Sequence, residues 1–200
     1  MTVLNEQQEA EENAADGTTV FGLWVYLMTD LVLFASLFAA YAVLHTSTFG
    51  GPSGRDIFDL PLVLAETLLL LTSSFTCGLA LLAARAGSAR GAVNWLGATF
   101  LLGAAFLAIE FSEFARLAGA GNGPPRSAFL SSYFTLVGTH GLHIVAGLLW
   151  IAALIFAVLR RGLSRSSLRK LMLFSMFWHF LDLVWIFIFT VVYLMGANLL

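Results

Sequence analysis

Five long apolar stretches alternate with short polar segments along the chain. They cover about residues 20–44, 60–84, 92–117, 129–159 and 171–195. Each is long enough to cross a membrane as one α-helix, which takes about 20 residues. The segments between them are rich in Gly, Pro, Ser and charged residues, which are typical of turns outside lipid. The pattern predicts an all-α integral membrane protein, a bundle of five transmembrane helices.

A polar, acidic segment of residues 1–19 precedes the first apolar stretch. It contains four Glu and one Asp but no Lys or Arg. A secretory signal begins with a basic region, so this segment is not one. We expect a mobile, solvated arm without chemistry, followed by a membrane domain that comprises residues 20–200.

Composition agrees with a membrane location. Hydrophobic residues make up 59% of the chain and charged residues only 11%, whereas about a quarter of a soluble domain is charged. A net charge of −2 argues against a nucleic-acid partner. The single cysteine, Cys77, lies within an apolar stretch, so neither a disulfide framework nor a cysteine-based metal site is expected.

Basic residues indicate the orientation. Seven of the ten Lys and Arg residues lie in the second and fourth connectors, on the same side as the N-terminus. The other three are Arg55, Arg116 and Arg126. Cytoplasmic loops carry the excess of Lys and Arg. The N-terminus is therefore predicted in the cytoplasm and the C-terminus in the periplasm.

Seven ionisable residues lie within the apolar stretches. They are Asp30, Glu66, Glu110, His140, His143, His179 and Asp182. Such residues are costly in lipid and face other helices or enclosed water. At a rise of about 1.5 Å per residue they fall at overlapping depths, so they can meet inside the bundle. No Lys or Arg occurs at that depth, and we expect most of the carboxyls to be neutral or to share a proton with histidine.

Two histidine pairings could serve as metal or haem ligands. His140 and His143 share a helix face, and His143 could face His179 across a haem. We favour interhelical hydrogen bonding for these residues. Asp182 shares a face with His179, and Glu113 is expected at the membrane interface beside Arg116.

Small and aromatic residues complete the pattern of helix contacts. Gly138, Gly141 and Gly147 allow another helix to approach the fourth stretch closely. Trp178 and Trp185 flank the polar face of the fifth stretch. We expect these tryptophans to pack against partner helices or lipid.

Several segments resemble subunit III of the haem-copper terminal oxidases. The most specific are Gly-Thr-His-Gly-Leu-His at 138–143 and Phe-Trp-His-Phe-Leu-Asp-Leu-Val-Trp at 177–185. The Glu-containing segment 109–114, the segment 59–67 and the segment 28–34 are also similar to motifs of that family. The resemblance covers about residues 20–197. Many cytochrome c oxidase members have seven helices, and this chain matches the last five, a short form most similar to subunit III of the bo-type ubiquinol oxidases.

The resemblance implies a non-catalytic subunit of a respiratory complex in the bacterial inner membrane. In this family, subunit I holds the haems and copper, reduces oxygen and pumps protons. Subunit III packs against subunit I in a complex that also has subunit II and a small subunit IV. It binds no haem or copper itself, holds phospholipids and supports proton uptake. By the same resemblance, Asp30 stands where the family has a buried carboxyl near subunit I, and the other six ionisable residues form a polar set between helices.

Three alternatives stay open at this point. The chain can be subunit III of a cytochrome c or menaquinol oxidase, because some of these also have five helices. It can be an autonomous iron enzyme that uses His140, His143 and His179. A proton or solute carrier is the third, although the sequence lacks the inverted repeat and the interrupted helices of many transporters.

Overall fold

Helices account for nearly all of the computed structural model, which describes the backbone of residues 2–198 and the side chains of residues 17–196. The long helices are α1 (Thr2–Leu44), α3 (Leu60–Arg85), α4 (Ala89–Gly119), α5 (Ala128–Arg161) and α6 (Arg165–Ile188). Shorter elements are α2 (Gly54–Ile57), the 3₁₀ turn η1 (Pro124–Arg126), the π-helical turn η2 (Phe189–Leu194) and α7 (Met195–Asn198). No strand occurs in the part of the chain that is described.

Five helical segments are long and apolar enough to cross a membrane. They are Gly17–Leu44, Leu60–Arg85, Ala89–Gly119, Ala128–Arg161 and Arg165–Leu194. The predicted all-α architecture with five long apolar helices is confirmed. The largest difference from the predicted limits is at the fifth segment, which begins at Arg165 rather than near residue 171 and so includes a basic first turn and a half.

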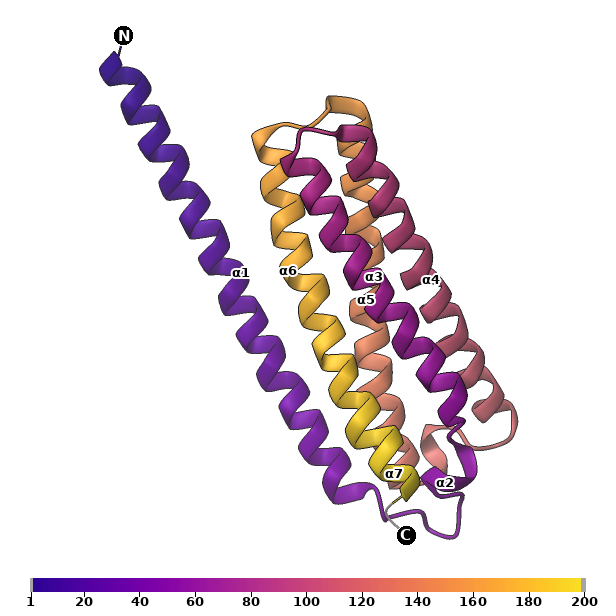
Figure 1. The fold of residues 1–200 in the computed structure, drawn as a ribbon. Helices are drawn as coiled ribbons and strands as arrows, with labels where there is room; N and C mark the ends of the chain where they lie inside the picture. Colours follow the sequence, from indigo (N-terminus) through magenta and orange to yellow (C-terminus); the bar gives the residue numbers. More distant parts are fainter. Residues whose placement is uncertain (1, 199–200) are drawn as a thin grey trace.

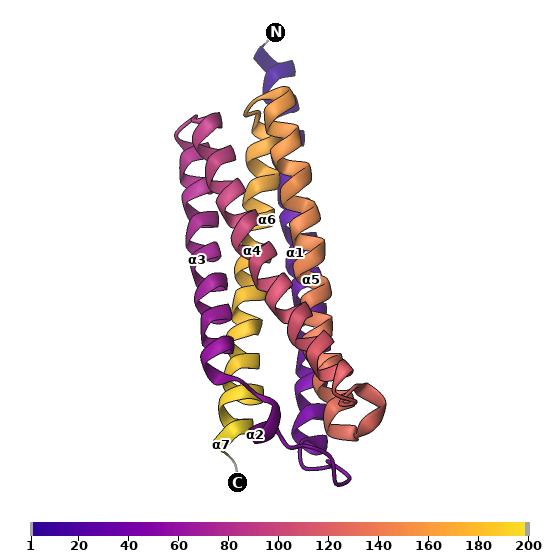
Figure 2. The ribbon, with the colours of Figure 1, turned by 90° about the vertical axis from the view of Figure 1, so that its right-hand side faces the viewer.

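Helices α3 to α6 form a compact group, and α1 lies along one side of it (Figures 1 and 2). Helix α1 contacts α5 and, over a shorter length, α6. The two ends of the chain lie at opposite ends of the molecule (Figure 1). Because α1 has few neighbours, many of its large apolar side chains are exposed, among them Phe21, Trp24 and Val32.

The acidic N-terminal segment is helical, which the sequence analysis did not anticipate. Residues 2–19 continue α1 without a break and extend past the other helices (Figure 1). Glu, Gln and Ala dominate this segment and are good helix formers. Extension of an existing helix also avoids the unfavourable nucleation of a new one.

Local sequence signals define where the helices begin. Asp59, Ser88, Ser127 and Ser164 precede α3, α4, α5 and α6, and the side chain of each accepts a hydrogen bond from the backbone N–H three residues later, at 3.1–3.4 Å. These caps satisfy backbone donors that have no partner within the helix. Gly162, with φ of +69°, ends α5 in a conformation that favours glycine.

The connector before α3 contains a hydrogen-bonded turn. The Asp56 carboxylate accepts hydrogen bonds from the Ser53 hydroxyl at 2.7 Å and from the Ser53 backbone N–H at 2.8 Å. These bonds to Ser53 lower the pKa of Asp56. A lowered pKa means that the turn is stabilised at neutral pH and loses this stabilisation as the pH falls through the folded-state value.

Trp178 occupies the centre of the helix group. Its side chain is 1% exposed, and its indole N–H donates a hydrogen bond to the Ser73 hydroxyl of α3 at 3.1 Å. The ring lies directly against Gly147 of α5 and Gly103 of α4. A Cβ atom at Gly147 would lie only 2.6 Å from the ring, and one at Gly103 would lie 3.0 Å from it. The expected close approach of another helix backbone at Gly147 is not what the structure has, because an indole ring packs against the glycine instead.

Trp185, two helical turns further along α6, makes a second contact of the same kind. The side chain is fully buried, and its indole N–H donates to the Thr67 hydroxyl of α3 at 3.0 Å. Its ring lies edge-on to Phe106 of α4, with ring centroids 4.7 Å apart. Both tryptophans thus pack against helices of their own chain, one of the possibilities expected from the sequence.

We predict that Gly147→Ala destabilises the chain, because the added methyl group overlaps the Trp178 ring in a packed core. The expected loss in the free energy of unfolding is about 1–3 kcal/mol. Denaturant unfolding in detergent measures it. Gly97→Ala is the matched control, because no atom lies within 4 Å of the added Cβ and Ala favours a helix. Equal stability of the two variants would contradict this packing.

Candidate functional site

The seven ionisable residues of the apolar stretches separate into three groups and one isolated histidine. Asp30 meets His143, Glu66 meets Glu110, and His179 lies near Asp182, whereas His140 stands alone. The sequence placed all seven at overlapping depths, and the structure distributes them among different helix faces.

Asp30 and His143 connect α1 to α5. Asp30 is 6% exposed, and its Oδ2 lies 3.5 Å from Nε2 of His143. Nδ1 of His143 is 2.8 Å from the Thr139 carbonyl oxygen. A carbonyl only accepts hydrogen bonds, so Nδ1 carries a proton and Nε2 is the atom that meets the carboxyl. The Phe34 ring covers the pair, with its centroid 5.3 Å from that of His143.

His140 is fully buried, and neither of its ring nitrogens has a hydrogen-bond partner among the described residues. It packs between Phe106 and Trp185, at centroid distances of 6.0 and 5.3 Å. The interhelical hydrogen bond favoured for this residue is therefore absent from the described contacts. Phe34 of α1 contacts both His140 and His143, at centroid distances of 6.4 and 5.3 Å, but the two histidines have different polar surroundings, since His143 meets Asp30.

His179 and Asp182 lie on a more open face, between α6 and α3. Nδ1 of His179 is 2.8 Å from the Ser74 hydroxyl of α3. The His179 side chain is exposed and Asp182 is half-buried. Both line an open groove with Ser74, Phe75 and Gly78. Within a membrane span, polar groups on such a face call for a neighbour that can hydrogen-bond.

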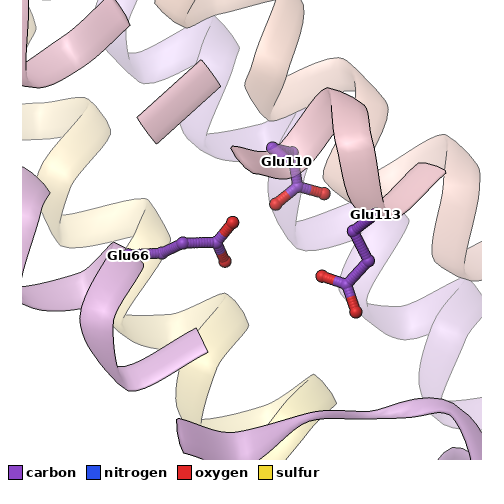
Figure 3. A group of neighbouring side chains, drawn as sticks. All are labelled: Glu66, Glu110 and Glu113. Atoms are coloured by element: carbon purple, nitrogen blue, oxygen red, sulfur yellow. The ribbon is translucent and has the colours of Figure 1, made fainter. Parts of the chain in front are cut away.

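Three glutamates meet between α3 and α4 near the end of the bundle that holds the C-terminus. Glu66, Glu110 and Glu113 each offer a carboxyl oxygen, and these oxygens lie within 4.8 Å of one another (Figure 3). The residues are 0%, 2% and 1% exposed. Arg116 donates to Glu113 at 3.4 Å and also reaches the Ile57 carbonyl at 3.5 Å.

Glu113 lies beside Arg116, as expected, but its carboxyl is buried and does not reach the surface. Its carboxyl is buried beside Glu110, one helical turn away, and it is the Arg116 side chain, 58% exposed, that reaches the surface. The spacing of three residues between Glu110 and Glu113 was the available signal, because it places both on one face. The sequence does not reveal that this face is turned toward Glu66.

The sequence pattern also did not single out the Ser, Thr and Tyr residues whose hydroxyls bond to other helices. Ser73 and Thr67 accept the two indole N–H bonds, and Ser74 meets His179. Tyr133 of α5 and Tyr193 of η2 also form a buried hydroxyl pair at 3.0 Å. Hydroxyls at these positions are indistinguishable in sequence from those that bond only to their own helix, as Thr72 does with Leu68.

These geometries favour structural roles for the histidines. His143 on α5 meets Asp30 of α1, whereas His179 on α6 meets Ser74 of α3. His45, near the end of α1, bonds only to the Ala42 carbonyl. In the described part of the chain, no histidine belongs to a group of three or more side chains whose ligand atoms lie close enough to share a metal ion.

Comparison with known proteins agrees with this picture. The family model described as cytochrome c oxidase subunit III matches residues 5–197. The chain belongs to the cytochrome c oxidase subunit III family. It is 62% identical to "Cytochrome bo(3) ubiquinol oxidase subunit 3" of Pseudomonas aeruginosa over 181 residues, 90% of this chain and 87% of the relative.

Two further relatives differ in their named activity. "Quinol oxidase subunit 3" of Bacillus subtilis is 45% identical, with 90% of this chain and 88% of the relative covered. "Cytochrome c oxidase subunit 3" of Bacillus sp. (strain PS3) is 46% identical, with 93% and 91% covered. With five spanning segments and bacterial subunit III relatives, the chain is a multi-pass protein of the bacterial inner membrane. Subunit III is a non-catalytic family.

We predict that Asp30→Asn leaves assembly of this subunit III into its complex nearly intact, because the amide retains a polar contact with His143. Asp30→Leu removes that contact and leaves Nε2 of His143 unpaired, at a cost of about 1–3 kcal/mol. The yield of purified complex, compared among wild type and both variants, measures the effect. A failure of Asp30→Asn to assemble would show that the charge or proton of this carboxyl is structural.

Proposed function

We propose that this chain is subunit III of a proton-pumping ubiquinol oxidase of the aerobic respiratory chain. The observation that carries the proposal is the 62% identity, over nine-tenths of the chain, to a protein named as subunit 3 of a cytochrome bo(3) ubiquinol oxidase. Electron transfer, oxygen reduction and proton pumping take place in the partner subunits. This chain has no catalytic centre of its own.

Its role is to pack on subunit I and keep the catalytic subunit stable and supplied with protons. The exposed apolar side chains of α1 support a large contact surface within the membrane. The groove at His179 and Asp182 presents polar groups where a neighbouring helix can satisfy them. Asp30, on α1, is the carboxyl we assign to the side nearest subunit I.

The partner subunits, the lipids and the orientation of the chain follow from this role. Subunit I holds the haems and copper, subunit II and a small subunit IV complete the complex, and phospholipids fill the remaining clefts. The N-terminus lies in the cytoplasm, because seven of the ten basic residues lie on its side of the membrane. The glutamate group then lies toward the periplasm.

A second candidate is subunit III of a cytochrome c or menaquinol oxidase. The relative from Bacillus sp. (strain PS3), named as a cytochrome c oxidase subunit, favours it at 46% identity. The higher identity to the ubiquinol oxidase subunit supports the first proposal. An autonomous iron enzyme or a proton carrier gains no support from the separated histidines.

Affinity purification of the complex from its native membrane tests the proposal. A tag on this chain should recover subunits I and II with two haems and copper in subunit I, and the preparation should oxidise ubiquinol with oxygen. Recovery of a complex that oxidises only cytochrome c would support the second candidate. A chain that purifies alone and turns over a substrate would contradict both.

We predict that Asp182→Leu reduces the yield of assembled oxidase more than it alters the haem spectra of the complex that survives. The substitution removes the polar group beside His179 in the groove where we place a neighbouring helix. The haems lie in subunit I, away from this residue. Immunoblots of membranes measure assembly, and absorbance spectra of purified complex measure the haems. The exposed residue Leu183 on the same helix provides a control, Leu183→Ala. A normal yield with a lost haem signal would contradict the assignment.

A further inference from the structure

The group of Glu66, Glu110 and Glu113 has no role in the contacts described so far. A packed membrane helix pair gains nothing from three facing carboxyls, because like charges repel and each is costly away from water. The ion pair found at the group is that of Arg116, which reaches Glu113. Something else must compensate the remaining two carboxyls.

A second, separate observation is the lack of hydrogen-bond partners for individual carboxyl oxygens. Both carboxyl oxygens of Glu66 and both of Glu110 lack a hydrogen-bond partner among the described residues, and so does Oε2 of Glu113. Glu66 and Glu110 are 0% and 2% exposed. Figure 3 shows the three side chains directed toward one another from α3 and α4. These are buried acceptors aimed at a common point without a donor.

The charge of the group defines what can occupy that point. With all three carboxyls ionised, the group and Arg116 together carry a net charge of two negative units. One divalent cation makes the assembly neutral, which is the condition for burying it within a membrane span. Two protons would achieve the same balance, and this is the competing occupancy.

The donor atoms and their spacing indicate the class of cation. Carboxylate oxygens are ligands for hard ions, and three carboxylates supply up to six of them. Calcium binds oxygen at about 2.3–2.6 Å, so ligands on opposite sides of it are up to about 5 Å apart. Magnesium, at about 2.0–2.1 Å, limits this separation to about 4 Å. The carboxyl oxygens of the glutamate group lie within 4.8 Å of one another, a limit that is closer to the wider calcium shell.

Arg116 connects the group to the surface. Its side chain is 58% exposed and donates to Glu113 at 3.4 Å. An ion can therefore approach the group along this side chain.

We propose that Glu66, Glu110 and Glu113 form a binding site for one calcium-class divalent cation, which joins α3 to α4. This inference concerns the chain itself and does not depend on which electron donor the complex uses. The cation balances the charge of the buried carboxylates and fixes the end of the bundle that holds the C-terminus. The site has no part in electron transfer.

Calcium content of the native complex tests the proposal. Wild type, Glu66→Gln and Glu110→Gln are purified through this chain and washed with a weak chelator, and calcium is counted by mass spectrometry per copy of the chain. We expect each Gln variant to contain one equivalent less than wild type. Asp30→Asn is the matched control, because it neutralises a buried carboxyl outside the group, and it should retain the full calcium content.

Terbium serves as a luminescent probe for calcium in the same preparations. Trp185, which bonds to Thr67, the residue after Glu66, serves as the sensitiser of its emission, and calcium should displace terbium from wild type. Binding should weaken by at least about 10–100-fold in the Gln variants, the loss found when even an outer-shell partner of a metal ligand is removed. If neither Gln variant assembles, a peak between the three carboxyls in a density map of the calcium-equilibrated wild type decides the question.

Two results would overturn the proposal. One is equal calcium content in wild type and in both Gln variants, or no density between the carboxyls. The other is an infrared signal of protonated carboxyls in wild type that is lost in Glu66→Gln and Glu110→Gln, because two protons would then occupy the group. Both results leave the subunit assignment intact, since that assignment fails only if the chain does not purify with oxidase subunits.

Discussion

The structure depends on the hydrogen bonds that join polar side chains of different helices within the apolar spans. The clearest case is the pair of indole N–H bonds from Trp178 and Trp185 to the hydroxyls of Ser73 and Thr67. Water is absent at this depth, so an unpaired N–H would cost several kcal/mol. The tryptophans are seven residues apart on α6 and the hydroxyls six apart on α3. Two bonds at two levels fix the register of these antiparallel helices, and the bare backbone of Gly147 makes room for the ring of Trp178.

The remaining polar contacts are arranged around this register. Once α3 and α6 are aligned, Ser74 lies beside His179 on the open face, and Glu66 is turned toward α4. Helix α1 is attached separately, through the contact of Asp30 with His143 on α5. Each interaction joins two helices, which is the arrangement expected of a subunit that supports a catalytic neighbour.

Much of the fold could be predicted from the sequence, because the hydrophobic effect acts on each stretch independently. The five spans and the residues that cap the helices follow from local patterns, but the ring that packs against Gly147 does not. Which faces meet does not follow, since that depends on how each helix is rotated about its axis. This is why His140 was expected to hydrogen-bond, although it packs against Phe106 and Trp185, and why Glu113 was expected at the interface, although it joins Glu110 in the interior. The resemblance to subunit III supplied the family, and it could not supply these contacts.

A double-mutant cycle on Trp185 and Thr67 tests the central claim most directly. The free energy of unfolding of this chain is measured in detergent for Trp185→Phe, Thr67→Val and the double variant. If the bond holds α6 to α3, the two effects are not additive and the coupling energy is about 0.6 kcal/mol or more, the usual scale for interhelical bonds in membranes. Additive effects, with a coupling energy near zero, would show that the polar contacts between the helices do not hold the bundle together.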